Sequence, residues 1–483
     1  MTRNALLLLI LSIAGFLRLY RFTAIPPGLY RDEAMNGSNA LEVLETGRFQ
    51  VFYPENAGRE GLYINVATVF IRLWGNKVWA LRLPAAVFGI LTVWGVYLLA
   101  AELASVEIAL LAAFFLATSF WHIDFSRIAF RAIAAPLFLT WALYFLLAAI
   151  RRFRQNWPCV GIAVLAGVVY GLGFYTYIAY RATPLLVAAV LLYGTPKAGR
   201  LKALFAASAT LAAGPLMLYF FRHPGTFLGR TSQVSVWHAP HPAWEVVRNL
   251  WRTGRMFFTR GDINWRHNIA WRAELFWPVA ILFVVGVALG SRRSSGAGDS
   301  PAVFPTPVLG LDLRRLALLW LAVAAAPVVL SGEAVPHALR AILMIPPVCL
   351  LAAGGAHRLH GWLSLKVPRT WLLAGSAAFL LVLTYEPYHT YFDLWARNPN
   401  VGPAFEAAAV QVAEQINRLP RETPKYVVTA DPMAAQPVMF LTASYTEKER
   451  RETNIHYVMS DSCGQVAVSQ PAARIFCLPN TLQ

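Results

Sequence analysis

Residues 80–122 read ALRLPAAVFGILTVWGVYLLAAELASVEIALLAAFFLATSFWH, and this stretch decides the class of fold. It contains two apolar runs, 80–102 and 106–122, which are joined by a short turn at Ala104-Ser105. A helix needs about 20 apolar residues to cross a bilayer. The stretch therefore predicts a tight hairpin of two helices inside a membrane.

The same apolar pattern extends over most of the chain. The 483 residues are 57% hydrophobic and only 14% charged, whereas soluble domains are about half apolar and a quarter charged. The first run follows Arg3 without a small-x-small cleavage site, so we read it as an uncleaved span rather than a signal peptide. The fold class that we expect is an all-α polytopic membrane protein. Its eleven predicted spans lie at roughly 4–20, 80–102, 106–122, 132–150, 158–176, 182–195, 203–221, 273–290, 316–331, 339–356 and 370–386.

Two further segments are predicted as helices that lie on the membrane. Residues 61–76 are apolar but end in Trp74-Gly75-Asn76-Lys77, so we expect a helix that leans on the membrane rather than a twelfth crossing. Within the 222–272 loop, Trp244, Val247 and Trp251 recur at helical spacing, with arginines on the opposite side. That arrangement is typical of an amphipathic helix on the outer bilayer surface, and anchoring is the simplest role for its aromatic residues.

The basic residues predict an orientation. Net charge is +17, and no nucleic-acid-binding motif accompanies it, so we expect no nucleic-acid partner. With the N-terminus in the cytoplasm, every cytoplasmic loop except the tight first one is basic, as the positive-inside rule requires. We therefore predict a plasma-membrane protein whose residues 294–310 form a flexible cytoplasmic linker. The residues behind this assignment are Arg151, Arg152, Arg154, Lys197, Arg200, Lys202, Arg292, Arg293, Arg314, Arg315, Arg358, Lys366 and Arg369.

The composition changes after the last span, and we divide the chain into residues 1–386 and 387–483. Residues 425–429, 455–459 and 474–478 have the character of short strands, and residues 405–419 have helical periodicity. These patterns predict a small extracytoplasmic α/β domain. On that side of the membrane Cys463 and Cys477 could form a disulfide.

Arginines also gather on the predicted outer side, where topology does not explain them. A guanidinium group matches the geometry of phosphate, so these residues indicate an anionic partner, although contacts with lipid headgroups account for some of them. They are Arg31, Arg48, Arg59, Arg127, Arg131, Arg181, Arg248, Arg252, Arg255, Arg260, Arg266 and Arg340.

Asp32 and Glu33 follow the first span and are the candidate acids at this face. They precede a predicted helix that Gly47 ends, so Asp32 could simply cap the helix and Glu33 favour its dipole. The two roles are compatible, because a capping carboxylate is held rigidly enough to act as a base.

Other polar clusters follow later spans at the same face. If residues 121–131 are helical, Asp124, Arg127 and Arg131 share one side, where two cations exceed one acid. The remaining candidates are Tyr177 and Arg181 in an outer turn, Asp262 and His267 in an outer loop, and His337 and Arg340 before the tenth span.

In order and position, these motifs resemble those of the polyprenyl-phosphate-dependent C-type glycosyltransferases, which include the dolichyl-phosphate-mannose protein mannosyltransferases and the aminoarabinose transferases. The resemblance covers the spans and not the tail. It is carried by Asp32-Glu33, by Ala80-Leu81-Arg82-Leu83-Pro84 and by His122-Ile123-Asp124-Phe125-Ser126-Arg127, and more weakly by residues 177–181 and 336–340.

The resemblance implies inverting transfer of a sugar from a polyprenyl-phosphate donor to an acceptor hydroxyl at the outer face. It implies that Asp32 is the catalytic base and that Glu33 and Asp124 belong to the same site. A phosphate leaving group needs cations more than a proton donor, so we assign Arg127, Arg131, Arg181 and Arg340 to the donor phosphate. We assign substrate contacts to His122, Tyr177, Asp262, His267 and His337.

Two questions stay open at this stage. A lipid flippase or transporter is the alternative function, although such proteins place ionisable groups near the middle of the bilayer and these spans have apolar centres. No residue set has metal-binding spacing, so we assign no metal ligands, while a divalent cation near the acids remains an option. Neither the sugar nor the acceptor (glycan, lipid or protein) follows from the sequence.

Overall fold

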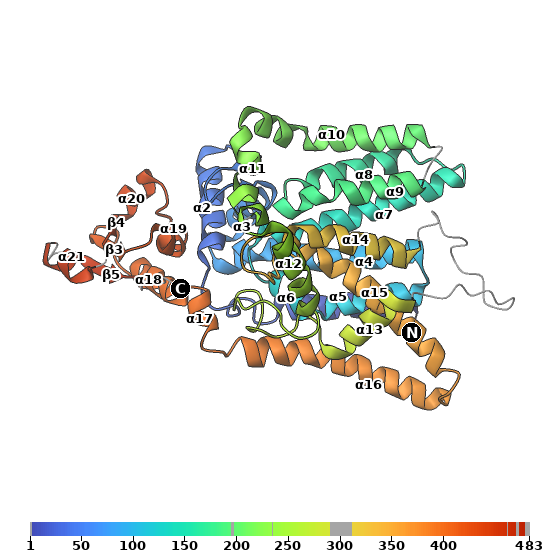
Figure 1. Cartoon of the computed structure of the whole chain (residues 1–483). Coiled ribbons are helices and arrows are strands. Elements are labelled where there is room, and N and C mark those ends of the chain that lie inside the picture. The colour runs from blue at the N-terminus through green and yellow to red at the C-terminus, as the bar shows by residue number, and fades with distance from the viewer. Residues whose placement is uncertain are drawn as a thin grey trace.

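The computed structural model describes residues 2–194, 198–233, 235–289, 312–460, 462–469 and 473–478. The predicted linker at 294–310 lies outside these ranges, as do Lys197, Arg292 and Arg293. Most of the long helices run alongside one another (Figure 1). They are α1 (Arg3–Leu19), α4 (Val78–Leu103), α5 (Val106–Ala117), α7 (Ala134–Arg154), α8 (Val160–Gly173), α9 (Pro184–Gly194), α10 (Gly199–Arg222), α13 (Trp277–Leu289), α14 (Leu313–Val329), α15 (Ile345–Leu363) and α16 (Arg369–Tyr388).

Each predicted span falls on one of these helices, but the number of crossings stays a prediction. Among the described residues, four helical segments are long and apolar enough to span a membrane: Val78–Leu103, Arg131–Arg154, Gly199–Arg222 and Ile342–Leu363. The fold is thus mostly helical and suited to a multi-pass membrane protein. The predicted tight hairpin is present as α4 and α5, because Ser105 caps α5 through its side chain.

Shorter elements cover one end of the bundle, where α2 and α3 lie (Figure 1). The predicted helix that ends at Gly47 is confirmed, since Gly47 takes a left-handed conformation (φ 69°) that favours glycine. These shorter elements are α2 (Arg31–Thr46), β1 (Phe52–Tyr53), β2 (Arg59–Glu60), α3 (Leu62–Trp74), α6 (Phe120–Phe125), η1 (Arg131–Ile133), η2 (Ile178–Ala182), α11 (Pro224–Gln233), η3 (Val236–His238), α12 (Pro242–Met256) and η4 (Ile342–Met344). Strands β1 and β2 form an antiparallel pair.

Close packing between the long helices depends on small residues. A Cβ atom at Gly286 of α13 would lie 1.9 Å from the carbonyl oxygen of Leu351 in α15, and one at Gly355 would lie equally close to that of Leu282. Glycine at both positions lets the two backbones touch, which is how helices associate where water provides no hydrophobic drive.

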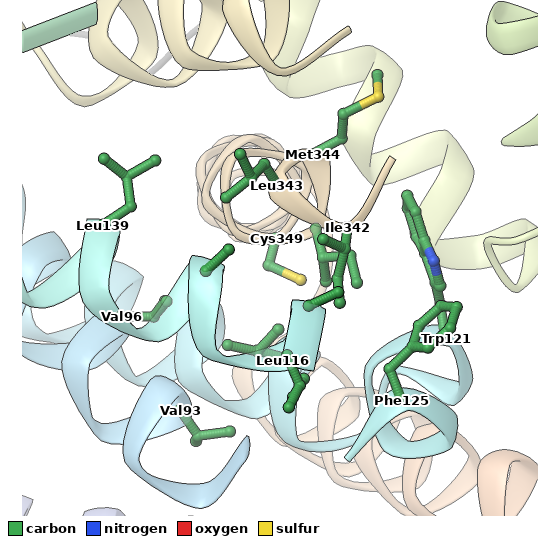
Figure 2. Close-up of a cluster of buried hydrophobic side chains, with 14 of the residues drawn as sticks. Val93, Val96, Leu116, Trp121, Phe125, Leu139, Ile342, Leu343, Met344 and Cys349 are labelled. Carbon is green, nitrogen blue, oxygen red and sulfur yellow. The ribbon is translucent and has the colours of Figure 1, made fainter. Parts of the chain in front are cut away.

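The main apolar core lies where α4, α5, α6, α7 and α15 meet (Figure 2). Trp121 of α6 is fully buried there, and its indole N–H donates to the carbonyl of Ala338, 3.1 Å away. Because Ala338 belongs to the segment between α14 and α15, this bond joins that segment to α6 at the same core.

The condition under which Asp124, Arg127 and Arg131 would share a helix face is not met. Residues 121–131 do not form a continuous helix: α6 ends at Phe125, so Asp124, Arg127 and Arg131 do not share a helix face. Beyond Ser126 the chain is irregular until η1, and the guanidinium of Arg127 turns to the backbone carbonyls of Leu17, Tyr20 and Ile25. A buried guanidinium needs acceptors, and an uninterrupted helix would have carried it away from them.

The C-terminal residues contain the three strands that the sequence predicts. They form a parallel sheet of order β4-β3-β5, which lies beyond the end of the bundle in Figure 1. A disulfide joins Cys463 to Cys477. This part comprises η5 (His389–Trp395), α17 (Val401–Ala404), α18 (Ala407–Asn417), β3 (Lys425–Thr429), η6 (Pro432–Ala435), α19 (Gln436–Leu441), α20 (Glu447–Thr453), β4 (Ile455–Met459), α21 (Cys463–Ser469) and β5 (Arg474–Cys477).

Candidate active site

Asp32 lies in the first turn of α2, but it does not cap the helix. Tyr30 occupies the N-cap position, and its backbone N–H donates to Glu33 Oε1 over 3.2 Å. The carboxylate of Asp32 is only partly buried and accepts one hydrogen bond, from Asn56 Nδ2 at 2.9 Å. Near the N-terminus of a helix a carboxylate is stabilised by the dipole, so Asp32 is held in place with capacity for a further partner.

Glu33 points elsewhere, because successive residues on a helix project about 100° apart. Its side chain is fully buried and forms a two-pronged ion pair with Arg82 of α4, with N–O distances of 2.8 and 2.9 Å. It also accepts the backbone N–H of Ala129 at 2.7 Å. The carboxylate of Glu33 is therefore occupied within the protein and does not line the cavity that Asp32 faces.

Asp32 faces a cavity of about 450 Å³ that is lined from several helices. Three predicted phosphate ligands line it too: Arg131, Arg181 and Arg340. Most of the wall is apolar. The cavity thus combines one carboxylate, three guanidinium groups and an apolar surface. Its apolar lining includes Phe130, Ile178, Phe227, Trp237, Leu330 and Leu339.

Two of these arginines share a single carboxylate that the sequence analysis did not single out. Glu60 of β2 is buried, with Oε2 3.0 Å from Arg131 Nε and Oε1 3.1 Å from Arg181 Nη2. Arg181 also donates to the carbonyl of Phe227 at 2.5 Å. Because one negative charge holds two positive ones, the pair keeps net positive charge at the cavity wall.

Arg340, the third arginine at this cavity, belongs to the segment between α14 and α15. Arg340 donates to the hydroxyl of Ser331 and to the carbonyl of Glu333, the latter over 2.8 Å. The Glu333 carboxylate lies 3.9 Å away on a side chain that is 63% exposed, so it neutralises Arg340 only weakly. Tyr177 also lines the cavity, with its ring 5.7 Å from the guanidinium of Arg131.

Asp262, His267 and His337 form a second cluster. His267 Nδ1 lies 2.8 Å from Asp262 Oδ2, and the two imidazole rings are 5.0 Å apart. Burial acts to raise the pKa of Asp262, but the two histidines and the N–H of Asn264 outweigh it and lower that pKa to about 2. A neighbouring cavity of about 810 Å³ is lined by Asp262 and by aromatic residues, and His337 lines both cavities.

Like Glu33, His267 lines neither cavity, and three more predicted site residues are buried inside the protein away from both. His122 is buried with Nδ1 2.7 Å from Arg18 Nη2. Arg127 is held by backbone carbonyls, as described above. Asp124 is fully buried without a hydrogen-bond partner among the described residues, and burial together with Glu274 raises the pKa of its carboxyl well above the usual range.

Four residues were not assigned to this site from the sequence, although Arg82 belongs to one of the motifs that carry the resemblance. Asn36 lines the cavity one helical turn after Asp32, Asn56 holds Asp32, Glu60 holds two arginines, and Arg82 neutralises Glu33. Asn36 could have been found from its i+4 spacing to Asp32 on the predicted helix. The others act through contacts between distant segments.

Comparison with known proteins identifies the fold. Residues 63–221 match the family model described as dolichyl-phosphate-mannose-protein mannosyltransferase. Among solved structures, ArnT from Cupriavidus metallidurans bound to undecaprenyl phosphate is 15% identical with a TM-score of 0.54, over 98% of this chain and 88% of ArnT. The oligosaccharyltransferase AglB from Archaeoglobus fulgidus, in complex with an inhibitory peptide and a dolichol-phosphate, is 14% identical with a TM-score of 0.54, over 91% of this chain and 63% of AglB. No curated protein matches the sequence.

Residues 63–221 thus resemble a glycosyltransferase family in sequence, and the chain as a whole resembles ArnT and AglB in fold. The resemblance that the sequence motifs predicted is therefore confirmed at this level. The segment matched by the family model includes Arg82 of α4, together with Arg131, Tyr177 and Arg181 at the cavity. These residues belong to the part of the chain whose sequence itself resembles a glycosyltransferase family.

Proposed function

We propose that this membrane glycosyltransferase moves a sugar from a polyprenyl-phosphate donor to an acceptor hydroxyl, with inversion at the anomeric carbon. One observation carries the proposal: Asp32 faces the cavity that also presents Arg131, Arg181 and Arg340 on an otherwise apolar wall. A lipid phosphate has the same two parts, an anionic head and an apolar chain.

Asp32 is the group that we assign as the base. It would take the proton of the acceptor hydroxyl as the acceptor oxygen attacks the anomeric carbon. The bond from that carbon to the phosphate oxygen breaks on the opposite face, so the sugar inverts and the lipid phosphate leaves. Its partial burial and its position in the first turn of α2 hold this carboxylate toward the cavity.

The three cavity arginines are assigned to the phosphate. Each charge-assisted hydrogen bond in such a site contributes about 1.5–3 kcal/mol. Charge builds up on the phosphate as it leaves, so these cations stabilise the transition state more than the ground state. This role needs no proton donor, unlike the second carboxyl group of hydrolases.

We assign positioning roles to the predicted site residues that lie away from the cavity. Glu33 with Arg82, and Arg127 with the carbonyls around Ile25, hold α2 and the segment before it. His122 and Asp124 pack beneath them in α6. Nothing in the family match or the fold favours the flippase alternative.

The membrane arrangement belongs to the proposal as well. We place the N-terminus in the cytoplasm, and the cavity and residues 387–483 on the outer side of the plasma membrane. We retain eleven crossings and a separate C-terminal α/β domain. A second buried apolar cluster supports the latter, since it includes Val427, Val438 and Ile455 and is distinct from the main core.

Substitution of Asp32 tests the catalytic assignment. Asp32→Asn should lower the transfer of radiolabelled sugar from polyprenyl phosphate in membranes by about 10²–10⁴-fold, because general-base catalysis contributes this much. The matched control is Glu45→Gln at the other end of α2, where Glu45 pairs with Lys448 at the surface. It should leave transfer unchanged.

Folding of Asp32→Asn is checked by its elution and melting temperature in detergent. Transfer at the wild-type rate in a folded Asp32→Asn protein would remove Asp32 as the base. Loss of activity in both variants would show that the assay reports the integrity of α2 and not the chemistry.

A further inference from the structure

The cluster of Asp262, His267 and His337 has the composition and spacing of a metal site. One potential ligand atom from each residue lies within 4.8 Å of the other two. Asp262 and His267 belong to the loop between α12 and α13, whereas His337 belongs to the segment between α14 and α15. Two imidazoles and one carboxylate are the donor set that favours Zn²⁺ over Mg²⁺ or Ca²⁺.

The carboxylate of Asp262 is fixed before any ion arrives. Its Oδ1 accepts the backbone N–H of Asn264 and its Oδ2 accepts that of Ala338, each over 2.8 Å. The second bond ties the two ligand-bearing segments together. Outer hydrogen bonds of this kind orient metal ligands and are part of most metal sites.

The cluster is also well shielded from water. The side chains of Asp262 and His267 are each 5% exposed, and that of His337 is 16% exposed. The ring of His267 packs 5.4 Å from Phe125 and 6.3 Å from Phe130, measured between ring centroids. Rings held in this way lose little freedom when they bind an ion.

Hydrogen bonds among the described residues explain the contact between Asp262 and His267 but not the buried position of His337 Nδ1. An Asp–His pair accounts for the 2.8 Å contact between Asp262 and His267. It does not account for His337 Nδ1, a buried nitrogen without a hydrogen-bond partner among the described residues. This nitrogen lies 3.8 Å from Asp262 Oδ2, too far for a hydrogen bond. Two ligands on one tetrahedral zinc ion are about 3.3 Å apart, so a shift of a few tenths of an ångström would bring both onto an ion.

We propose that Asp262, His267 and His337 bind one zinc ion at the boundary of the two cavities. Three protein ligands leave a fourth position free in a tetrahedral site. His337 lines both cavities, and Asp262 lines the larger one, so the ion would lie where the two cavities adjoin. The ion would also bind the α12–α13 loop to the segment before α15. The inference does not rest on the proposed glycosyl transfer.

Metal content of the full-length protein tests the site directly. The protein is stripped with a chelator in detergent, incubated with Zn²⁺, desalted and analysed by mass spectrometry. We expect about one zinc per chain, and at least tenfold weaker binding in His337→Ala and Asp262→Ala. The matched control is His389→Ala, because His389 pairs with Asp393 at 3.3 Å but is 43% exposed; it should bind as the wild type does.

Co²⁺ provides a second readout that does not depend on activity. Co²⁺ bound to the wild type should show the visible absorption of a tetrahedral ion, and His337→Cys should add a thiolate charge-transfer band. That band can arise only if residue 337 touches the metal. The proposal is overturned if stripped wild-type protein binds no zinc, if His337→Ala binds it as the wild type does, or if His337→Cys lacks the band while it retains Co²⁺.

Discussion

Two groups of arginines lie at the same end of this molecule and are held in opposite ways. Arg18, Arg82 and Arg127 are fully buried, and backbone carbonyl oxygens accept most of their hydrogen bonds. Arg131, Arg181 and Arg340 line a cavity and keep 15–18% of their side chains exposed. The sequence analysis placed Arg127 of the first group with all three of the second, as cations of the predicted outer face.

The difference teaches how each group is used. Apart from Ala14 inside α1, the carbonyls to which the inner arginines bond lie where the chain ends a helix or lacks regular structure, at residues 17, 20, 25, 26, 28, 116 and 117. They replace the backbone hydrogen bonds that these segments would otherwise lack. The outer arginines are held mainly from one side and direct positive charge into open space. The first group builds the site, and we assign the second group to binding within it.

The largest expected effect is a loss of folding stability when one of the inner arginines, Arg82, is replaced. Arg82→Met leaves the Glu33 carboxylate buried without its cation, and both side chains are at most 1% exposed. Breaking one half of a buried ion pair costs about 3–5 kcal/mol. We therefore expect a large drop in melting temperature and in the yield of folded protein in detergent.

A matched control and a rescue sharpen this first test. Arg397 pairs with Asp393 at 3.0 Å, but Arg397 is 72% exposed, so Arg397→Met should change stability by about 0.5 kcal/mol or less. The double variant Arg82→Met with Glu33→Leu should recover part of the lost stability, because no unpaired charge remains. If Arg82→Met is as stable as Arg397→Met, the inner arginines do not build the site.

An intermediate effect is expected on donor binding, from changing the cavity group. Arg181→Met should weaken the binding of undecaprenyl phosphate by about 10–150-fold, the equivalent of the 1.5–3 kcal/mol assigned to a charge-assisted hydrogen bond. The melting temperature should change little, since Glu60 keeps its partner Arg131. Binding is measured by the ligand-dependent rise in melting temperature.

Arg248→Met is the control for this second test. Arg248 is 51% exposed on α12 and also carries a positive charge on the predicted outer side. Its loss should leave binding unchanged. Equal weakening in both variants would mean that general surface charge, and not the cavity, attracts the lipid phosphate.

The smallest effect on sugar transfer is expected from Asp124→Asn. This variant tests whether the buried carboxyl group of Asp124 takes part in the reaction, as we propose for Asp32. Burial raises the pKa of Asp124 well above its usual range and so favours the neutral carboxyl group, which an amide of similar shape replaces with little change in charge. We expect transfer within about threefold of wild type and a similar melting temperature. A loss as large as that expected for Asp32→Asn would show that Asp124 takes part in the chemistry.

Local patterns predicted much of this arrangement. The helix from Glu33 to Thr46, the three C-terminal strands and the gathering of Asp32 with Arg131, Arg181 and Arg340 all follow from periodicity, turn residues and topology. The helix and the strands depend on residues that are close in the sequence. The gathering of Asp32 with the three arginines follows from placing their segments on the same predicted side of the membrane.

The residues that lie away from the cavity, against the sequence assignment, have a feature in common. The sequence placed Arg127 with the donor phosphate and Glu33 with the catalytic groups, but the partners of these two residues lie 49–110 positions away. The same holds for Glu60, whose carboxylate joins Arg131 and Arg181 across 71 and 121 positions. No periodicity reports such pairings, because they arise only once separate segments pack together.

Arg31, the residue before Asp32, contacts both Glu406 and Asp431. The first turn of α2 is therefore fastened to the C-terminal residues, which lie 375 and 400 positions further along the chain. Movement of the tail would be transmitted to the neighbouring carboxylate through one side chain. The position of the carboxylate that we assign as the base therefore depends on two acids of the C-terminal part as well as on the helix that carries it.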